Sequence, residues 1–126
     1  MTDRPIKIPG PDHPITIIPT NGRVVVKLAG QTVADSRNAL TLREASYPPV
    51  HYIPLADVDQ SLLAPSDHMT YCPYKGECNY HGLPHGGDRG RNAVWTYREP
   101  YEAVAAIRDH VAFYPDRVDS IEVLSA

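Results

Sequence analysis

The stretch YCPYKGECNYHG at residues 71–82 gathers two cysteines, a histidine and a lysine among three tyrosines. Thiol, imidazole and ammonium groups bind metals, act as nucleophiles or hold anions, so several kinds of site are compatible with it. The stretch also has the residues of a tight turn. Pro73 suits a turn's second position, and Gly76 can adopt a left-handed conformation that closes a short hairpin. We therefore expect a hairpin that presents Tyr74 and Lys75 at a rigid corner.

A zinc site in this region would use two cysteines and two histidines, namely Cys72, Cys78, His81 and His85. The spacing of the two histidines is one that zinc sites allow. The cysteine spacing is not, because five residues separate the pair where zinc knuckles usually place two to four. No second cysteine pair occurs elsewhere in the chain. We therefore predict no metal site and no cofactor.

A catalytic cysteine is another interpretation of the same stretch. Lys75 or a histidine close to Cys72 would lower the pKa of its thiol, and a base oriented by a third group would complete the site. No spacing in the sequence identifies that base. Cys72 also suits the end of a strand, where a buried thiol packs as a small apolar residue. Both interpretations of Cys72 stay open.

Glu44 and Lys75 are the charged candidates for a binding or catalytic site. If Leu40 and Leu42 face the core, Glu44 at the end of the same alternating strand shares their side. A carboxylate placed there must find partners, or its pKa rises, as in a general base. Lys75 on a rigid corner beside aromatic rings would hold an anionic or π-rich ligand. The alternatives are a solvated turn lysine and a strand-end carboxylate, either free in water or paired with an arginine.

The aromatic residues form a third group of candidates, and tyrosine dominates it. The chain has eight tyrosines, one tryptophan and one phenylalanine, so many hydroxyl groups need hydrogen-bond partners. A pocket lined by such tyrosines would be partly hydrated, with polar contacts to a ligand. The alternative is ordinary core and cross-strand packing. The pocket candidates are Tyr52, Tyr80, Trp95 and Tyr97. His13, His51 and His68 have no partner at a recognisable spacing.

Short strands must position these side chains. The chain has thirteen prolines, which interrupt helices and confine strands to edges or ends. Alternating apolar patterns predict strands at 13–18, 23–30, 32–36, 39–45, 47–54, 68–72, 77–82, 92–97 and 119–124. Asn21-Gly22 predicts a hairpin turn. Residues 83–91, with three glycines, predict a flexible loop.

One helix is predicted near the C-terminus. Pro100 suits the first helical position, and Val104, Ile107, Val111 and Tyr114 recur at helical spacing on one face. Pro115 would end it. The expected fold is mainly β (α+β): a compact antiparallel β-tent or barrel-like domain with one C-terminal α-helix.

Size and charge restrict the classes of protein. The 126 residues suit one domain, which we place at 13–126 behind an extended N-terminal arm at 1–12. The formal net charge of −3 gives no electrostatic case for a nucleic-acid partner. The sequence has no apolar run long enough for a membrane span, and its N-terminus lacks the apolar centre of a signal peptide. We therefore expect a cytoplasmic protein with neither a nucleic-acid nor a membrane partner.

From His13 to Val123 the sequence resembles the DUF427 family of small proteins. The resemblance is carried by LREASYPPVHYIP (42–54), YCPYKG with Tyr80 (71–80), AVWTYREP (93–100) and VAFYPDRV (111–118). The Cys-Pro-Tyr-Lys-Gly string together with the later Trp-x-Tyr-x-x-Pro is the specific part. The resemblance implies a small β domain of β-tent or Mss4-like shape, and it places Lys75, Tyr80 and Trp95 in the family's motifs. No glycine-rich phosphate loop or paired-aspartate metal motif accompanies them.

Three functions are compatible with these residues. The first is binding of a small anionic or aromatic metabolite in a pocket lined by Glu44, Tyr52, Lys75, Tyr80, Trp95 and Tyr97. The second is an enzyme built on the same pocket, with Glu44 as general base and Lys75 or Cys72 as acid, nucleophile or electrostatic stabiliser. The third is a protein-interaction module without a pocket. Convergence of Glu44 and Lys75 in one cleft would favour the first two.

Overall fold

The computed structural model of the protein describes residues 4–125, which form ten β-strands and five short 3-10 helices. The strands are β1 (Ile15–Pro19), β2 (Arg23–Leu28), β3 (Gln31–Ser36), β4 (Leu40–Glu44), β5 (Val50–Pro54), β6 (Ala64–Cys72), β7 (Gly76–Gly82), β8 (Val94–Thr96), β9 (His110–Phe113) and β10 (Ser120–Leu124). The 3-10 helices are η1 (Leu55–Asp57), η2 (Gln60–Leu62), η3 (Pro84–Gly90), η4 (Glu102–Ile107) and η5 (Pro115–Arg117). The mainly β composition agrees with the sequence pattern.

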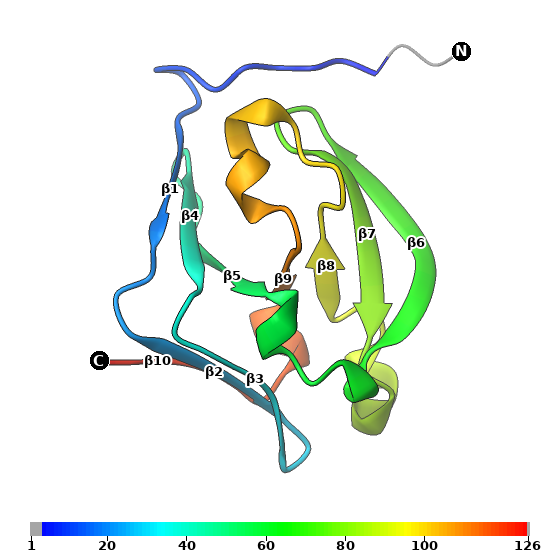
Figure 1. Cartoon of the computed structure of the whole chain (residues 1–126). Helices are drawn as coiled ribbons and strands as arrows, with labels where there is room; N and C mark the ends of the chain where they lie inside the picture. The colour runs from blue at the N-terminus through cyan, green and yellow to red at the C-terminus, as the bar shows by residue number, and fades with distance from the viewer. Residues whose placement is uncertain (1–3, 126) are drawn as a thin grey trace.

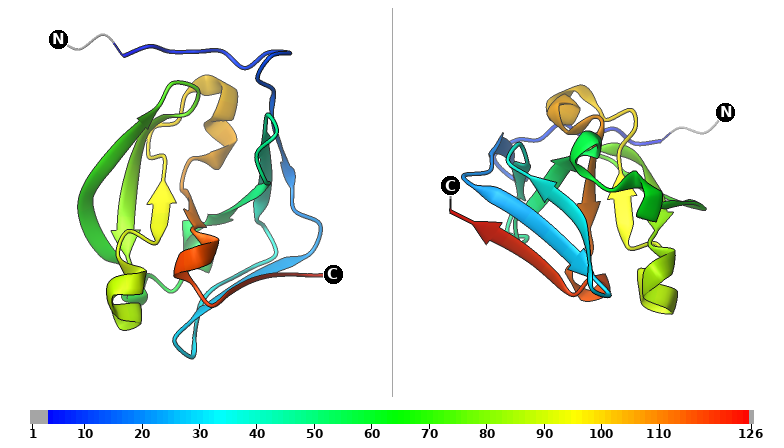
Figure 2. Two further views of the ribbon diagram at one scale, coloured as in Figure 1. Left: turned by 180° about the vertical axis from the view of Figure 1, so that it is seen from behind. Right: turned by 60° about the horizontal axis from the view of Figure 1, so that its bottom comes forward.

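The strands make two antiparallel sheets. Seven strands follow the order β1-β4-β5-β9-β8-β7-β6, and three follow the order β10-β2-β3. The larger sheet curls so that β1 and β4 face β6 and β7 across the molecule, with η4 between these two wings (Figure 1). The smaller sheet lies across one end of the larger one, with β10, β2 and β3 side by side (Figure 2). Within residues 4–125 the end strands β1 and β6 do not pair with each other, so the expected β-tent or barrel-like domain is not a closed barrel.

The Asn21-Gly22 turn connects the two sheets. Gly22 has a φ of +119°, the left-handed conformation that favours glycine. The flanking strands do not pair with each other, because β1 pairs with β4 while β2 pairs with β3 and β10. The predicted hairpin at this position is therefore wrong. The dipeptide predicted a turn but gave no information about which strands it would bring together.

The predicted C-terminal α-helix is also wrong. The segment instead consists of η4, which is irregular at Val104 (φ −124°, ψ 25°), followed by β9. Asp109 has a φ of +62°, which reverses the chain between them. Val111 then pairs with Ile53 of β5. Val104 and Ile107 are buried in η4 and Val111 is buried in β9, because β5 and β8 offer backbone partners to the segment that contains Val111.

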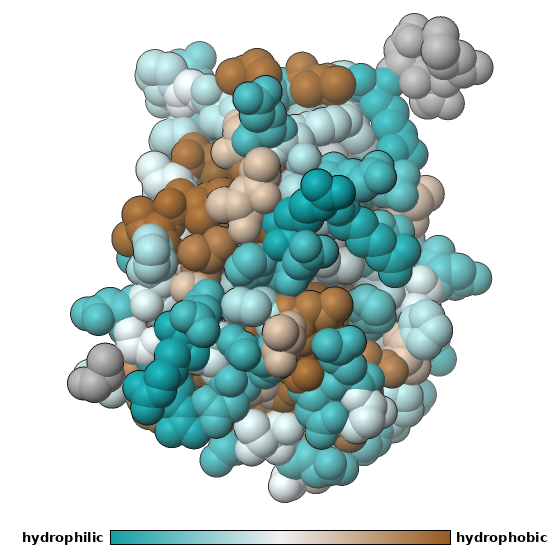
Figure 3. Space-filling view, viewed as in Figure 1, coloured by the Kyte–Doolittle hydropathy of each residue, from teal (hydrophilic) through white to brown (hydrophobic). Residues whose placement is uncertain are grey.

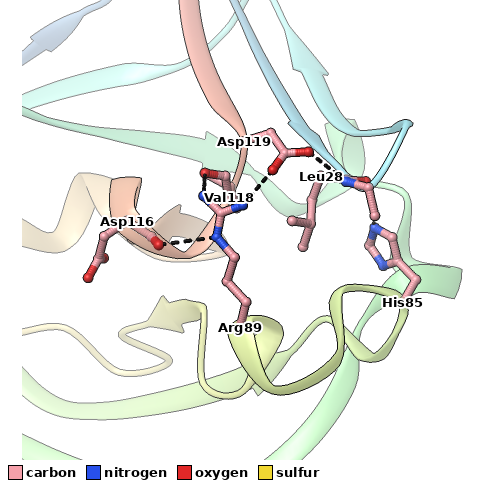
Figure 4. A network of polar contacts seen from close by, with 7 residues as sticks. Leu28, His85, Arg89, Asp116, Val118 and Asp119 are labelled. Atoms are coloured by element: carbon pink, nitrogen blue, oxygen red, sulfur yellow. Dashed lines mark hydrogen bonds and ion pairs between the residues drawn. The ribbon is translucent and has the colours of Figure 1, made fainter.

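Residues 83–91 form a fixed connection where a flexible loop was expected. Arg89 of η3 donates to Asp119 at 2.5 Å and to the carbonyl of Val118 at 2.7 Å, which ties η3 to the start of β10 (Figure 4). His85 bonds the carbonyl of Leu28 at 3.0 Å. A Cβ on Gly90 would lie 2.0 Å from the carbonyl oxygen of Leu83, so close backbone packing explains that glycine.

The buried residues divide into two clusters. The aliphatic cluster lies between the two sheets and consists of Val24, Val26, Leu28, Val33, Ala34, Ala39, Ile53, Val58, Leu83, Ala93, Val94, Val111, Phe113 and Val118. The aromatic cluster lies between the wings of the larger sheet and consists of Leu42, Tyr52, Cys78, Tyr80, Tyr97, Val104, Ile107 and Ala112. Three of the predicted pocket residues, Tyr52, Tyr80 and Tyr97, belong to the second cluster, and Trp95 packs against it.

The N-terminal arm is extended where the structure describes it. Residues 4–9 have no secondary structure and cross one end of the molecule above the wings (Figure 1), while residues 1–3 of the predicted arm lie outside the described residues. Ile6 and Ile8 are 60% and 79% exposed, and apolar side chains are visible along this edge as well as on the left side of the view (Figure 3). None of the helices within residues 4–125 has the length and apolar character that a membrane crossing requires.

Candidate functional site

The corner that carries Lys75 is a tight hairpin between β6 and β7. Cys72 pairs with Gly76 across a three-residue loop, and Gly76 has the positive φ (+110°) expected of the closing glycine. The backbone N–H of Tyr101 donates to the carbonyl of Lys75 at 3.1 Å, so the 99–101 segment supports the turn. The Lys75 residue is only 9% exposed. It is therefore not a solvated turn lysine.

Lys75 and Glu44 converge although 31 positions separate them in the chain. The ammonium Nζ of Lys75 forms an ion pair with Oε1 of Glu44 at the end of β4. The other oxygen, Oε2, lies 2.7 Å from Nε2 of His13. The ring of His13 stacks on Tyr74 with centroids 4.0 Å apart and an interplanar angle of 3°. One carboxylate thus joins three segments: the residues before β1, the end of β4 and the β6–β7 corner.

The pKa of Glu44 falls below its ordinary value. Burial alone would raise it, but hydrogen bonds from Lys75 and His13 stabilise the carboxylate and more than offset that effect. Of the two alternatives for a carboxylate placed here, partners or a raised pKa, the structure shows the first. Glu44 is an ionised hydrogen-bond acceptor near neutral pH.

A cavity of about 200 Å³ opens beside the ion pair, between β4 and β5 on one side and β7 and β8 on the other. Its walls include all six residues predicted from the sequence: Glu44, Tyr52, Lys75, Tyr80, Trp95 and Tyr97. They also include Leu42, Tyr47, Pro48, Val50, Cys78 and Tyr114. The structure thus brings together charged and aromatic side chains from segments distant in the sequence.

The aromatic walls are linked to one another by polar contacts. Nε1 of Trp95 donates to the hydroxyl of Tyr52 at 3.1 Å, and the two rings meet edge to face at 6.3 Å. The hydroxyl of Tyr80 lies 2.9 Å from that of Thr70 and 3.5 Å from that of Tyr114. The two shorter contacts, Trp95 with Tyr52 and Tyr80 with Thr70, fix the orientation of rings that would otherwise rotate, whereas the contact between Tyr80 and Tyr114 is at the limit of a hydrogen bond.

Burial keeps the phenol and thiol groups of the cavity protonated. Desolvation raises the pKa of Tyr52, Tyr80 and Tyr97 above that of a free phenol. It also raises the pKa of the Cys78 thiol, although hydrogen bonds with neighbouring hydroxyls partly offset the rise. At neutral pH the cavity therefore presents one carboxylate, one ammonium and several neutral O–H donors.

The remaining sequence candidates do not join this arrangement. Cys72 ends β6 and packs against the aromatic cluster without lining the cavity. His85 contacts Leu28 in the distant β2–β3 region. Among the residues that the structure describes, no three histidine, cysteine or acidic side chains gather in a metal-binding arrangement, so the zinc set of Cys72, Cys78, His81 and His85 is not assembled.

His13 and Tyr114 were missed as site residues. His13 had no partner at a recognisable spacing, and only the antiparallel register, which pairs Ile15 with Glu44, brings it beside that carboxylate. Tyr114 was placed on the face of a helix that the structure lacks. A signal for His13 was present: it lies two residues before the start of β1, and in an antiparallel pair the start of one strand lies beside the end of its partner.

The comparison with protein families agrees with the motifs quoted above. The model of the domain of unknown function DUF427 matches residues 16–124. No curated protein matches the chain. The matched region contains every cavity residue named here, whereas His13 lies before it. Because the match covers most of the chain, the protein belongs to the DUF427 family.

Proposed function

We propose that the protein binds a small aromatic molecule carrying one polar group. The observation that carries this proposal is the cavity of about 200 Å³ with four predicted aromatic walls and the Glu44–Lys75 pair at one side. A cavity of about 150 Å³ accepts benzene, and drug-sized pockets begin near about 300 Å³. The volume therefore suits a single six-membered ring with a small substituent.

The chemistry of the walls supports the choice of ligand. Rings stack well between tyrosine and tryptophan side chains, and the neutral hydroxyl of Tyr97 can donate to a polar substituent. Lys75 has more N–H donors than its bond to Glu44 uses, and Glu44 is an acceptor beside it. A ligand substituent that both accepts and donates hydrogen bonds, such as a hydroxyl or an amide, can accept from Lys75 and donate to Glu44.

A thermal-shift screen of small aromatic metabolites tests the proposal, because a ligand bound only by the folded form raises the apparent melting temperature. For each ligand found, calorimetry measures its affinity for the native protein and for two variants. Trp95→Leu removes a cavity wall, and Glu122→Gln, which changes an exposed residue of β10, is the control. We expect Trp95→Leu to weaken binding at least about tenfold, since stacking of a planar ring on an aromatic side chain contributes about 1–3 kcal/mol. Equal affinities in the two variants would overturn the proposal.

A second candidate function is an enzyme at the same cavity. The observation in its favour is the carboxylate of Glu44 held between an imidazole and an ammonium. Glu44 lines the cavity and is the residue for which the sequence suggested the role of base, with His13 as a partner that orients its carboxylate. Neither His13 nor Cys72 lines the cavity, so neither takes the role of base or nucleophile in this scheme. If a hit from the screen is converted to product and Glu44→Gln binds it without turnover, the enzyme is favoured.

A further inference from the structure

The ion pair at the cavity leaves little positive charge for an anionic ligand. Lys75 was the candidate anion site in the sequence, yet its ammonium is paired with Glu44, and both side chains are nearly buried. A ligand carboxylate or phosphate placed there would meet the charge of Glu44 as well as that of Lys75. An anionic group, if the ligand has one, therefore needs a different partner.

A second hollow, the arginine cleft, lies directly behind two walls of the cavity. It has a volume of about 370 Å³ and is lined by Arg91, Arg117, His68 and Asp116 together with Tyr80 and Tyr114. The two tyrosines also line the aromatic cavity, so the hollows share a wall. Their hydroxyls are 3.5 Å apart, at the outer limit of a hydrogen bond, and they can separate at low cost.

The charge of the arginine cleft is not neutralised by ion pairs. Within residues 4–125 neither Arg91 nor Arg117 has a carboxylate oxygen within 4 Å. Arg117 Nη1 approaches the carbonyls of Asp88 and Arg89 at 3.5 and 3.4 Å, which directs the guanidinium but leaves most of its donors free. Asp116 is the one carboxylate among the residues that line the cleft, against two guanidinium groups.

We propose that the ligand has two parts: an aromatic ring in the cavity, and a phosphate or carboxylate held by Arg91 and Arg117 beyond Tyr80 and Tyr114. This inference rests on the proposed function, and it names the substrate class as aromatic compounds with an oxyanion at a short distance from the ring. Guanidinium groups bind such oxyanions through paired N–H donors, a geometry that lysine does not offer.

Calorimetry with a series of phosphate esters tests the inference. Phenyl, benzyl and 2-phenylethyl phosphate place the same oxyanion at increasing distances from one ring, while phenol and inorganic phosphate represent the two halves. We expect one of the esters to bind at least about tenfold more tightly than phenol, since a charge-assisted hydrogen bond contributes about 1.5–3 kcal/mol. The gain should decrease with added salt because both arginines are exposed.

Variants then locate the oxyanion. Arg91→Gln and Arg117→Gln should each remove most of the gain shown by the best ester while leaving phenol binding unchanged. Arg108→Gln, an exposed arginine outside both hollows, is the matched control and should change neither. Because all three positions are exposed, loss of folding does not complicate the comparison.

The outcomes separate this inference from the proposal on which it rests. If phenol binds but no ester binds more tightly, the two-part ligand is wrong and the aromatic site stands. If inorganic phosphate binds as tightly as the best ester, the two hollows are not used together, and the inference is also overturned. If neither phenol nor any ester binds, the proposed aromatic site fails, and the inference fails with it.

Discussion

The two buried clusters of this protein differ in what their side chains can do. In the aliphatic cluster, valine, leucine, isoleucine and alanine dominate, and the region joins the two sheets. The aromatic cluster has three tyrosines and a cysteine, and an ion pair closes one side of it. Aliphatic side chains fill space without needing partners, whereas each buried hydroxyl or charge must be satisfied.

This difference indicates a division between stability and function. A domain that needed only to fold would gain little from tyrosines and an ion pair in its interior, since apolar residues of similar volume are often as stabilising. The aromatic cluster retains a cavity, while its residues keep their hydrogen bonds within the wall. The predictions below test whether the clusters separate in this way.

The largest effect is expected in the aliphatic cluster. Leu83 is fully buried there, so Leu83→Ala removes apolar contacts and leaves a void. We expect a loss of about 2–5 kcal/mol in the free energy of unfolding, measured by urea denaturation. Leu124→Ala at a 40% exposed site is the control and should cost less than about 1 kcal/mol. A loss below about 1 kcal/mol for Leu83→Ala would contradict a structural role for this cluster.

Breaking the ion pair should have the next largest effect. Lys75→Met leaves Glu44 with His13 alone in a site where the side chain is 13% exposed, so we expect a loss of about 2 kcal/mol. The double variant Lys75→Met/Glu44→Gln should recover part of it, since no charge is then left unpaired. The exposed pair of Arg23 and Asp35 is the comparison, and Arg23→Met should cost less than about 1 kcal/mol. Equal losses at the two pairs would show that burial of the Glu44 pair has no consequence.

A smaller effect is expected on acidification. Because the pKa of Glu44 is lower in the folded protein than in the unfolded chain, its carboxylate stabilises the fold above the unfolded pKa of about 4.5. This contribution is lost as the pH falls through the lower, folded pKa. We therefore expect the difference in unfolding free energy between the native protein and Glu44→Gln to shrink from pH 6 to pH 3. A difference that is constant with pH would mean that Glu44 is not held ionised by its partners.

The smallest effect on stability belongs to the cavity wall. Tyr97→Phe removes one hydroxyl and leaves the ring, so the free energy of unfolding should change by less than about 1 kcal/mol. Affinity for a phenol-type ligand should nevertheless fall about fivefold, the equivalent of one hydrogen bond. Calorimetry on Tyr97→Phe and on Tyr47→Phe, which is 63% exposed at the rim, distinguishes the inner wall from the rim. If Tyr97→Phe lowered stability strongly and left affinity unchanged, Tyr97 would have a structural role and not a ligand-binding one.

Much of the fold was predictable because its signals are local. Alternating apolar residues identified nine of the ten strands, and the Pro73–Gly76 turn followed from the backbone preferences of its residues. The helix prediction at 100–115 failed because the spacing of Val104, Ile107 and Val111 fits either a helix or a set of buried contacts from two elements. Backbone partners on β5 and β8 decided the outcome, and a single segment carries no information about them.

The lining of the cavity could be predicted in part, and its chemistry less so. Residue types and family motifs led to six of the twelve residues that line the cavity. The direction of the Glu44 pKa depended on how many donors would reach it, which a sequence does not specify. The partnership with His13 depended on strand register, a long-range property.

The N-terminal arm has a practical consequence for anyone who prepares this protein. Lys7 donates its backbone N–H to the carbonyl of Pro73 at 2.9 Å, and Tyr71 donates to the carbonyl of Pro5 at 2.8 Å. The arm is thus fastened to the hairpin that carries Lys75, yet it precedes the region shared with the family. A version trimmed to the family boundary would lack the imidazole beside Glu44 and the backbone contacts of the arm with the β6–β7 hairpin. Assays on such a shortened protein would therefore measure a cavity whose ion pair has lost one of its partners.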